Sequence, residues 1–215
     1  MNTTELIQKI SVNDVDVDKF VQLAILEEHT RDEIVKQLLT HPDIMVYYHC
    51  YYVVSKASQE RPELFYEYWD EIAALLQHKN SYHRDIALTI IANLTLVDHK
   101  DLFSKIFDDY FEHINDKKFM TGKCCVQNSI KILKAKHALK NQIIDLLLDV
   151  DAQCTYTEKQ KELLKYDVLE ILDEVYEELI DKKYANKFIK AGVTSISPKT
   201  RRKAKELVGK YALRD

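Results

Sequence analysis

The apolar residues of this chain recur in a pattern that repeats about every 38 to 41 positions. In each copy, apolar pairs stand four positions apart, which places them on one face of an amphipathic helix. The copies begin at Leu64-Phe65, Leu102-Phe103, Ile143-Ile144 and, in a weaker form, Tyr184-Ala185. A period of this length is typical of stacked helix pairs, in which neighbouring pairs bury a shared apolar face.

A second pattern recurs at a similar interval and marks the first helix of each pair. It begins with a basic residue and continues with apolar residues three, seven and ten positions later. The basic residues are Arg84, Lys123, Lys165 and Arg201. Together the patterns predict helix pairs near residues 43–77, 82–115, 119–151 and 160–191, preceded by helices near 3–39 and followed by one helix at 198–211.

Local signals predict where helices begin, and the apolar faces predict the core. The expected caps are Thr30 with Glu33, Ser81, Thr157 with Gln160, and Ser197 before Pro198. The side chains expected to be buried between neighbouring pairs are Phe65, Trp69, Phe103, Phe107, Ile144 and Leu148.

The repeating unit resembles a known family of helical repeats. A two-helix unit of about 39 residues, with Arg84 and Ala87 early in its first helix and Asp98 between the helices, resembles the HEAT repeat. The resemblance covers roughly residues 42–211 and implies an all-α, α-α superhelix, that is, a HEAT-like solenoid of antiparallel helix pairs. Residues 1–215 would then form a single domain, with capping helices at 1–40, about four repeats at 42–191 and a capping helix at 197–215.

The composition agrees with an almost entirely helical chain. Only three Gly and three Pro occur in 215 residues, so the chain cannot supply the turns of a sheet-rich fold or a phosphate-binding glycine loop. The N-terminal residues lack the features of a signal peptide, and no apolar run is long enough to span a bilayer. The four cysteines show no disulfide-framework spacing, and we therefore expect a cytoplasmic protein with reduced thiols.

No motif predicts a cofactor, a metal or a catalytic group. Cys124 and Cys125 are neighbours on a predicted helix and point about 100° apart, so they cannot readily share an ion. No zinc-ligand spacing, serine elbow or phosphate loop occurs. HEAT-like solenoids do include DNA-alkylation-repair glycosylases and bilin lyases, so the resemblance alone does not exclude an enzyme. We expect a protein without enzymatic activity.

One predicted helix, near residues 44–57, is apolar nearly all round. It carries Tyr47, Tyr48, Tyr51 and Tyr52. Such a helix is normally buried between neighbours, where the tyrosine hydroxyls find partners. The alternative is an aromatic groove that anchors a peptide.

Aligned second helices place acidic residues in register. Asp70, Asp108 and Asp149 share one position opposite the apolar face, and Glu71 and Asp109 lie beside two of them. In a HEAT-like solenoid the second helices line the concave surface, where these residues would form an acidic ladder that selects a basic protein partner. The alternative is ordinary solvation of a polar face.

The C-terminal part is basic despite the net charge of −4. From Lys182 onward there are eleven Lys and Arg against two acidic residues. A polar face is expected of a capping helix, but a basic end could also contact phosphate. The sequence therefore favours a scaffold that binds a protein partner through its concave face, without membrane contact. The alternative is a nucleic-acid-binding solenoid, possibly glycosylase-like, that uses the basic C-terminal helix.

Overall fold

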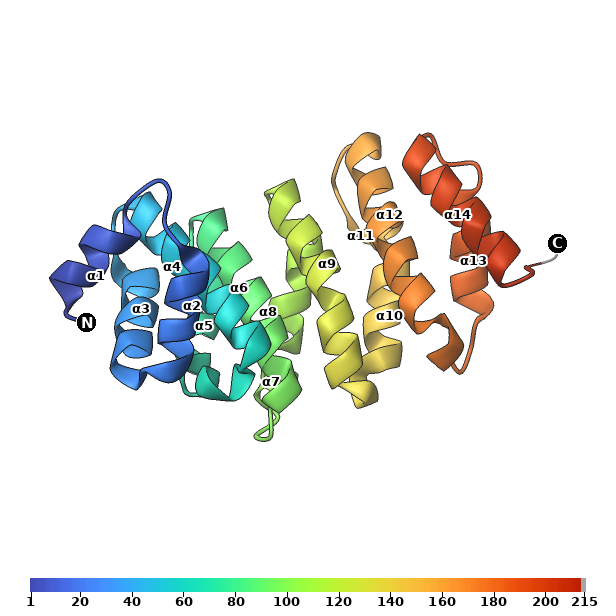
Figure 1. The fold of residues 1–215 in the computed structure, drawn as a ribbon. Coiled ribbons are helices and arrows are strands. Elements are labelled where there is room, and N and C mark those ends of the chain that lie inside the picture. The colour runs from blue at the N-terminus through green and yellow to red at the C-terminus, as the bar shows by residue number, and fades with distance from the viewer. Residues whose placement is uncertain (214–215) are drawn as a thin grey trace. The chain divides into compact units, whose positions relative to one another are not determined.

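The protein is all-α. The computed structural model describes residues 1–213, and 80% of the chain is helical with no β-strand among those residues. The α-helices are α1 (Thr3–Ile10), α2 (Val17–Leu26), α3 (Glu28–Thr40), α4 (Ile44–Glu60), α5 (Trp69–Ala73), α6 (Ser81–Leu94), α7 (Leu102–Lys105), α8 (Phe107–Phe111), α9 (Phe119–Ala135), α10 (Lys140–Leu148), α11 (Val150–Gln153), α12 (Glu158–Val175), α13 (Lys183–Gly192) and α14 (Pro198–Lys210) (Figure 1). The chain divides into two compact units, Met1–Ile106 and Phe107–Asp215.

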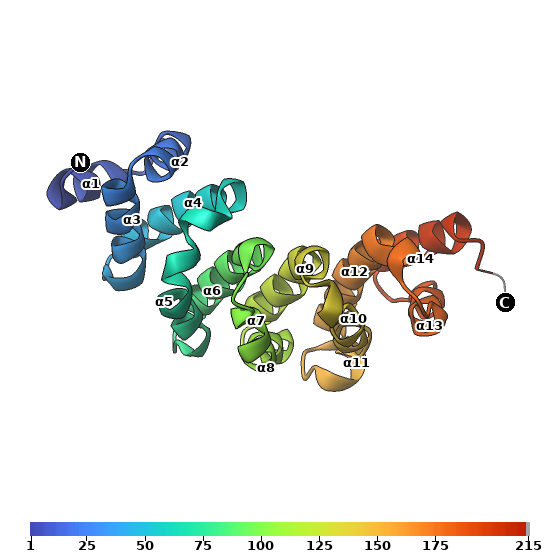
Figure 2. The same cartoon turned by 90° about the horizontal axis from the view of Figure 1, so that it is seen from below.

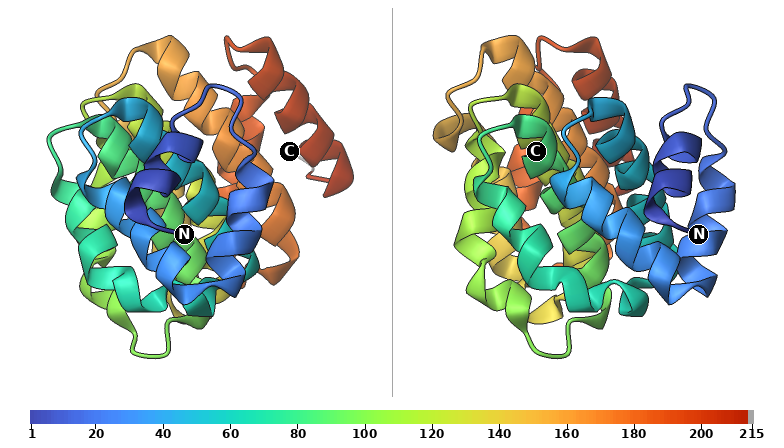
Figure 3. Two further views of the ribbon diagram at one scale, coloured as in Figure 1. Left: turned by 60° about the vertical axis from the view of Figure 1, so that its left-hand side comes forward. Right: turned by 90° about the vertical axis from the view of Figure 1, so that its left-hand side faces the viewer.

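The first unit is built around α4. Helices α2, α3 and α6 pack on α4, and α1 also contacts it (Figures 1 and 3). The ring nitrogen Nδ1 of His49 on α4 donates a hydrogen bond of 2.6 Å to the carbonyl oxygen of Ile10 at the end of α1. The buried side chains of Leu6 and Ile10 belong to the same core. The N-terminal helices therefore cover an apolar surface of α4.

The second unit has two sides. Helices α9, α12 and α14 follow one another along one side, while α8, α11 and α13 lie on the other (Figure 2). Helix α12 buries the side chains of Leu164, Val168 and Leu172, which contribute to the core between the two sides. Helix α14 buries Ala204 and Leu207.

Several hydrogen bonds join residues that lie 38 to 40 positions apart, close to the sequence period. They run from Asn93 Nδ2 to Ser55 O (3.0 Å), from Tyr156 OH to Asp116 O (2.7 Å) and from Thr200 Oγ1 to Glu162 O (2.9 Å). The first lies in the first unit and the others in the second. Each bond thus joins two residues that stand about one period apart in the sequence.

Two of the predicted helix starts are confirmed. Thr157 and Gln160 form a reciprocal capping box at the start of α12. The hydroxyl of Ser197 accepts a hydrogen bond from the backbone N–H of Thr200, and Pro198 occupies the first position of α14. Proline suits this position because its missing N–H would have had no partner within the helix.

Two other predicted starts are wrong. Helix α3 begins at Glu28, so Thr30 lies inside it and donates to the carboxylate of Glu27. Helix α6 is capped by Asn80, whose side chain accepts from the backbone of Tyr82, and Ser81 is the first helical residue. At α6 the Asn80 side chain takes the capping role predicted for Ser81, whereas at α3 the N-cap residue Glu27 makes no side-chain capping hydrogen bond.

The second element of each pair is less regular than the period predicts. In the first unit it begins with the short 3-10 segments Pro62–Leu64 and Tyr66–Tyr68 before α5. In the second unit α8 passes into a 3-10 segment at Glu112–Asn115. Large buried side chains such as Phe65 determine the positions of these turns more strongly than continuous helical hydrogen bonding does.

Five of the six predicted core residues are buried: Phe65, Trp69, Phe103, Phe107 and Ile144. The prediction for Leu148 needs correction, because its side chain is only half-buried. It lies at the end of α10 and lines a surface hollow.

Candidate functional site

All five residues of the predicted acidic ladder are exposed, and none takes part in an ion pair within residues 1–213. Asp70 and Glu71 lie on α5 in the first unit. Asp108 and Asp109 lie on α8, and Asp149 is the N-cap residue of α11, in the second unit. A continuous row across both units stays a prediction. Asp149 lines a hollow in the second unit.

That hollow, which we call the acidic cleft, is an open cavity of about 660 Å³ in the second unit. One wall comes from α10 and α11 and the other from α13. Its lining residues are Asp145, Leu148, Asp149, Asp151, Tyr184, Lys187, Phe188 and Ala191. Three carboxylates against one ammonium group give the lining a formal charge of −2. The side chain of Tyr184 is 60% exposed at this surface.

Asp145 and Asp149 are unpaired carboxylates of the acidic cleft, since neither takes part in an ion pair in the described part of the chain. They stand four positions apart at the C-terminal end of α10. Like charges at this spacing repel each other, and the negative end of the helix dipole adds to the cost for Asp145. The sequence reasoning missed Asp145, although its spacing from Asp149 was the signal that could have identified it.

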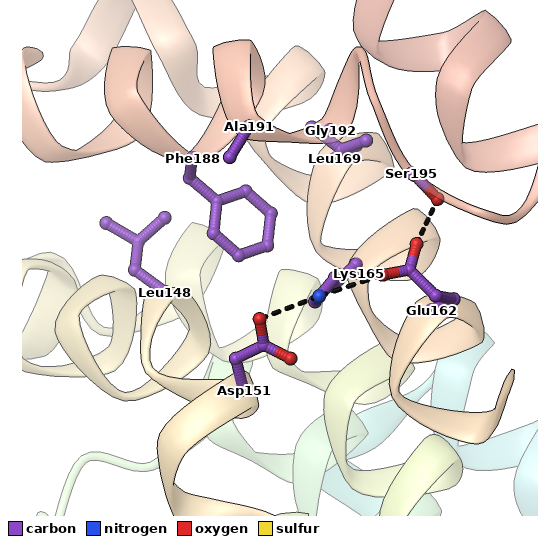
Figure 4. A pocket seen from close by; sticks show the side chains of 9 residues that line it. All are labelled: Leu148, Asp151, Glu162, Lys165, Leu169, Phe188, Ala191, Gly192 and Ser195. Carbon is purple, nitrogen blue, oxygen red and sulfur yellow. Dashed lines mark hydrogen bonds and ion pairs between the residues drawn. The ribbon is translucent and has the colours of Figure 1, made fainter. Parts of the chain in front are cut away.

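A smaller hollow, which we call the apolar pouch, adjoins the acidic cleft and has a volume of about 100 Å³. Its lining residues are Leu148, Asp151, Glu162, Lys165, Leu169, Phe188, Ala191, Gly192 and Ser195. Figure 4 shows Phe188 and Leu148 on one side and the polar side chains at the opposite end. Gly192 allows α13 to approach α14, because a Cβ atom there would lie 2.9 Å from Cβ of Ala204.

The polar end of the pouch is a closed set of interactions. Lys165 Nζ forms ion pairs with Asp151 (2.7 Å) and Glu162 (2.8 Å), and Ser195 donates to the other oxygen of Glu162 (Figure 4). Burial opposes the charge on Lys165, but its hydrogen bonds to the two carboxylates outweigh burial and raise the pKa of the ammonium group. A protonated lysine cannot remove a proton from Ser195, so this arrangement is suited to positioning the loop after α13 rather than to nucleophilic catalysis.

The basic helix α14 is largely occupied with contacts inside the second unit. Lys203 Nζ pairs with Asp173 (2.7 Å) and Glu170 (3.1 Å), and Lys210 pairs with Asp173 (2.6 Å). The guanidinium group of Arg201 donates to the carbonyl oxygen of Ser195 at 2.6 Å. These side chains hold α14 against α12 and against the loop that precedes α14.

The tyrosines of α4 are divided between core and surface. Tyr47 is buried, whereas Tyr52 is 44% exposed. Tyr48 packs edge-on against Tyr52, with ring centroids 5.0 Å apart, and against Tyr82, at 5.8 Å. Burial and the neighbouring tyrosines raise the pKa of Tyr48 to about 12. The rings pack against one another, so this cluster is a partly exposed extension of the core.

The cysteines and histidines form no metal centre in the described residues, where no group of three potential ligands occurs. Burial raises the pKa of the Cys50 thiol to about 12 and that of Cys154 to about 11. Both thiols therefore stay protonated at neutral pH and are poor nucleophiles. Within residues 1–213, no helix combines the length and the apolar character needed to cross a membrane.

Comparison with known proteins supports the fold alone. No family model and no curated protein matches the chain. Among solved structures, the chain is similar to an engineered protein from the Northeast Structural Genomics Consortium, with a TM-score of 0.50 and 12% identity over 97% of this chain and 96% of that one. A second engineered protein from the same consortium matches with a TM-score of 0.46 and 13% identity over 97% and 98% of the two chains.

Proposed function

We propose that this chain is a HEAT-like α-solenoid that serves as a non-enzymatic, cytoplasmic scaffold for a basic protein partner. The period of the sequence and the hydrogen bonds between residues one period apart support a stacked-repeat architecture. The second elements of the pairs would form its concave face, which carries the exposed carboxylates of the acidic ladder.

The observation that carries the proposal is the acidic cleft. It combines unpaired carboxylates at Asp145 and Asp149 with the exposed ring of Tyr184 and the half-buried Phe188. Carboxylates next to aromatic surface suit a partner that presents Lys or Arg, because such a group gains both charge and cation–π contacts. The protein would act by rigid preorganisation, since a packed helical array loses little entropy when it binds.

Affinity capture with three forms of the protein tests the proposal. The wild type is compared with the triple variant Asp70→Lys, Asp108→Lys, Asp149→Lys and with a control that carries three reversals at other exposed acidic positions, Asp14→Lys, Glu60→Lys and Glu158→Lys. We expect basic proteins, identified by mass spectrometry, to be retained by the wild type and the control and lost from the triple variant. Equal retention by all three forms would contradict the proposal.

A further inference from the structure

The acidic cleft and the apolar pouch are adjoining parts of one surface. They share Leu148, Asp151, Phe188 and Ala191, so a bound chain could place one side chain in each hollow. Both hollows lie entirely within the second unit, on helices α10 to α13 and the loop that follows.

The pouch offers apolar surface to a ligand. Its charged groups satisfy one another through the ion pairs of Lys165 with Asp151 and Glu162. The half-buried side chains of Leu148 and Phe188 are therefore its available apolar walls, above the buried Leu169. A volume of about 100 Å³ is smaller than the roughly 150 Å³ of a cavity that accepts benzene. It therefore suits an aliphatic side chain such as Val, Leu or Ile.

The acidic cleft presents two negative charges at one end of α10. Asp145 and Asp149 repel each other across one turn of α10, and in the described part of the chain no cation pairs with them. A guanidinium group can bind two carboxylate oxygens at once and stack its plane on an aromatic ring. Tyr184, on the opposite wall, provides such a ring.

We infer that the second unit recognises a basic segment of a partner protein in which an aliphatic side chain enters the apolar pouch and an arginine binds Asp145 and Asp149. The inference rests on the proposed function and specifies its chemistry. The apolar pouch supports the inference independently of Asp145 and Asp149. Its apolar walls favour an aliphatic side chain near the arginine, which attraction between charges alone would not require. The two hollows together therefore define a two-point recognition site.

The test uses a phage-displayed library of random 12-residue peptides, selected on the full-length wild-type chain. We expect the selected peptides to combine arginine with Val, Leu or Ile. Replacing that arginine with Gln in a labelled synthetic copy should weaken binding at least about tenfold, since a charged hydrogen-bonding group is lost. Replacement with Lys should have a smaller effect.

Two variants assign the contacts. Asp145→Asn with Asp149→Asn should weaken binding at least about tenfold and remove most of its salt dependence. Ala191→Leu, at an exposed position where the two hollows meet, should narrow the pouch and weaken binding of the same peptide. The preference for arginine should persist in this variant, because Asp145 and Asp149 are unchanged. The matched controls are Glu158→Gln with Asp14→Asn, and Ala138→Leu, all at exposed positions outside both hollows.

The outcomes separate this inference from the proposed function. Selection of basic peptides whose affinity is unchanged in either the cleft variant or the pouch variant would overturn the two-point inference. The proposed function would still stand if the Asp70, Asp108 and Asp149 triple variant loses the basic proteins that the wild type retains. Failure of the wild type to select basic peptides would overturn both. Thermal unfolding of each variant establishes that it is folded, and the two variants test the site at different residues, so loss of one fold would leave the other measurement decisive.

Discussion

At the scale of single residues, Phe65 and Phe103 are fully buried in the core, on the helix face that the spacing of apolar pairs predicts. Leu148 follows the same spacing but lies beside a hollow, where its neighbours do not close over it. Periodicity specifies which face of a helix turns inward. The depth of burial also depends on the position of the adjoining helix, and the sequence pattern of one segment carries no information about that position.

Replacing Phe107 with Ala should cost about 3–5 kcal/mol of unfolding free energy, because it removes a large buried ring. Its ring lies 4.8 Å from that of Phe111 between centroids, and 6% of the residue is exposed. Urea unfolding followed by circular dichroism provides the measurement. Met120→Ala in the same unit, at a residue that is 63% exposed, is the control and should change stability little. Equal effects of the two substitutions would contradict the assigned core.

Asp145 should lower stability in the unbound protein. The substitution Asp145→Asn removes both the repulsion from Asp149 and the unfavourable charge at the end of α10, and we expect a gain of about 0.2–0.5 kcal/mol. Glu158→Gln is the control, since its carboxylate lies favourably in the first turn of α12 and its neutralisation should have the opposite sign. A loss of stability on Asp145→Asn would mean that the carboxylate has a structural role.

At the scale of helices and turns, the presence of most helices could be predicted from the sequence. The residues at which they begin, and the interruptions within them, were less predictable. Thr157 caps α12 as the sequence predicts. The N-cap residue of α6 is Asn80 and not the predicted Ser81. Two adjacent residues that can both cap a helix differ little in free energy, so contacts in the folded protein decide between them. The 3-10 segments on either side of Phe65 were not predicted for a similar reason, because tertiary packing of a large side chain can override the helical pattern of the sequence.

The ion pairs of Asp173 should make the attachment of α14 dependent on pH. Burial opposes ionisation of Asp173, but hydrogen bonds from Lys203, Lys210 and Tyr211 outweigh it and lower its pKa from 3.8 to about 2. A depressed pKa stabilises the folded state above the unfolded value, so this contribution should be complete above about pH 4 and lost as the pH falls toward 2.

The substitution Asp173→Asn should therefore cost about 1–3 kcal/mol at neutral pH, because hydrogen bonds to a charged group are lost. The difference from wild type should shrink as the pH is lowered from about 4 to 2. Chemical unfolding at a series of pH values measures it. Asp181→Asn is a control, since Asp181 is exposed and accepts a bond only from the backbone of Lys183. A difference that persists unchanged at pH 2 would contradict the role given to the carboxylate.

At the scale of the whole molecule, the high helix content could be predicted from the sequence, because one amphipathic period recurs along most of the chain. The acidic cleft was predicted only in part. Asp149 was identified by its register, but the cleft also needs Tyr184 and Phe188 from a helix more than thirty positions later. Which residues face each other across a hollow depends on how two helices are placed, and a repeat pattern does not specify the space between them.

The basic C-terminus leads to a prediction about nucleic acids. Because Lys203 and Lys210 are paired with Asp173, α14 has less free positive charge than its sequence indicates. We expect no DNA or RNA binding in gel-shift titrations at roughly 50 and 200 mM salt, where phosphate-dependent affinity should differ strongly. A shift at low salt that is abolished by Arg202→Gln with Lys205→Gln would favour the nucleic-acid alternative.

The hydrogen bonds between residues one period apart have a consequence for how the chain is synthesised. Many side-chain hydrogen bonds join residues about one period apart, and the contact between Lys123 and Asp167 spans 44 positions. A helix pair therefore has its bonding partners once the next pair has left the ribosome, and it does not wait for the C-terminus. Short-range contacts of this kind favour rapid folding. We expect the earlier pairs to acquire structure during translation, which limits the time that their apolar faces are exposed to aggregation.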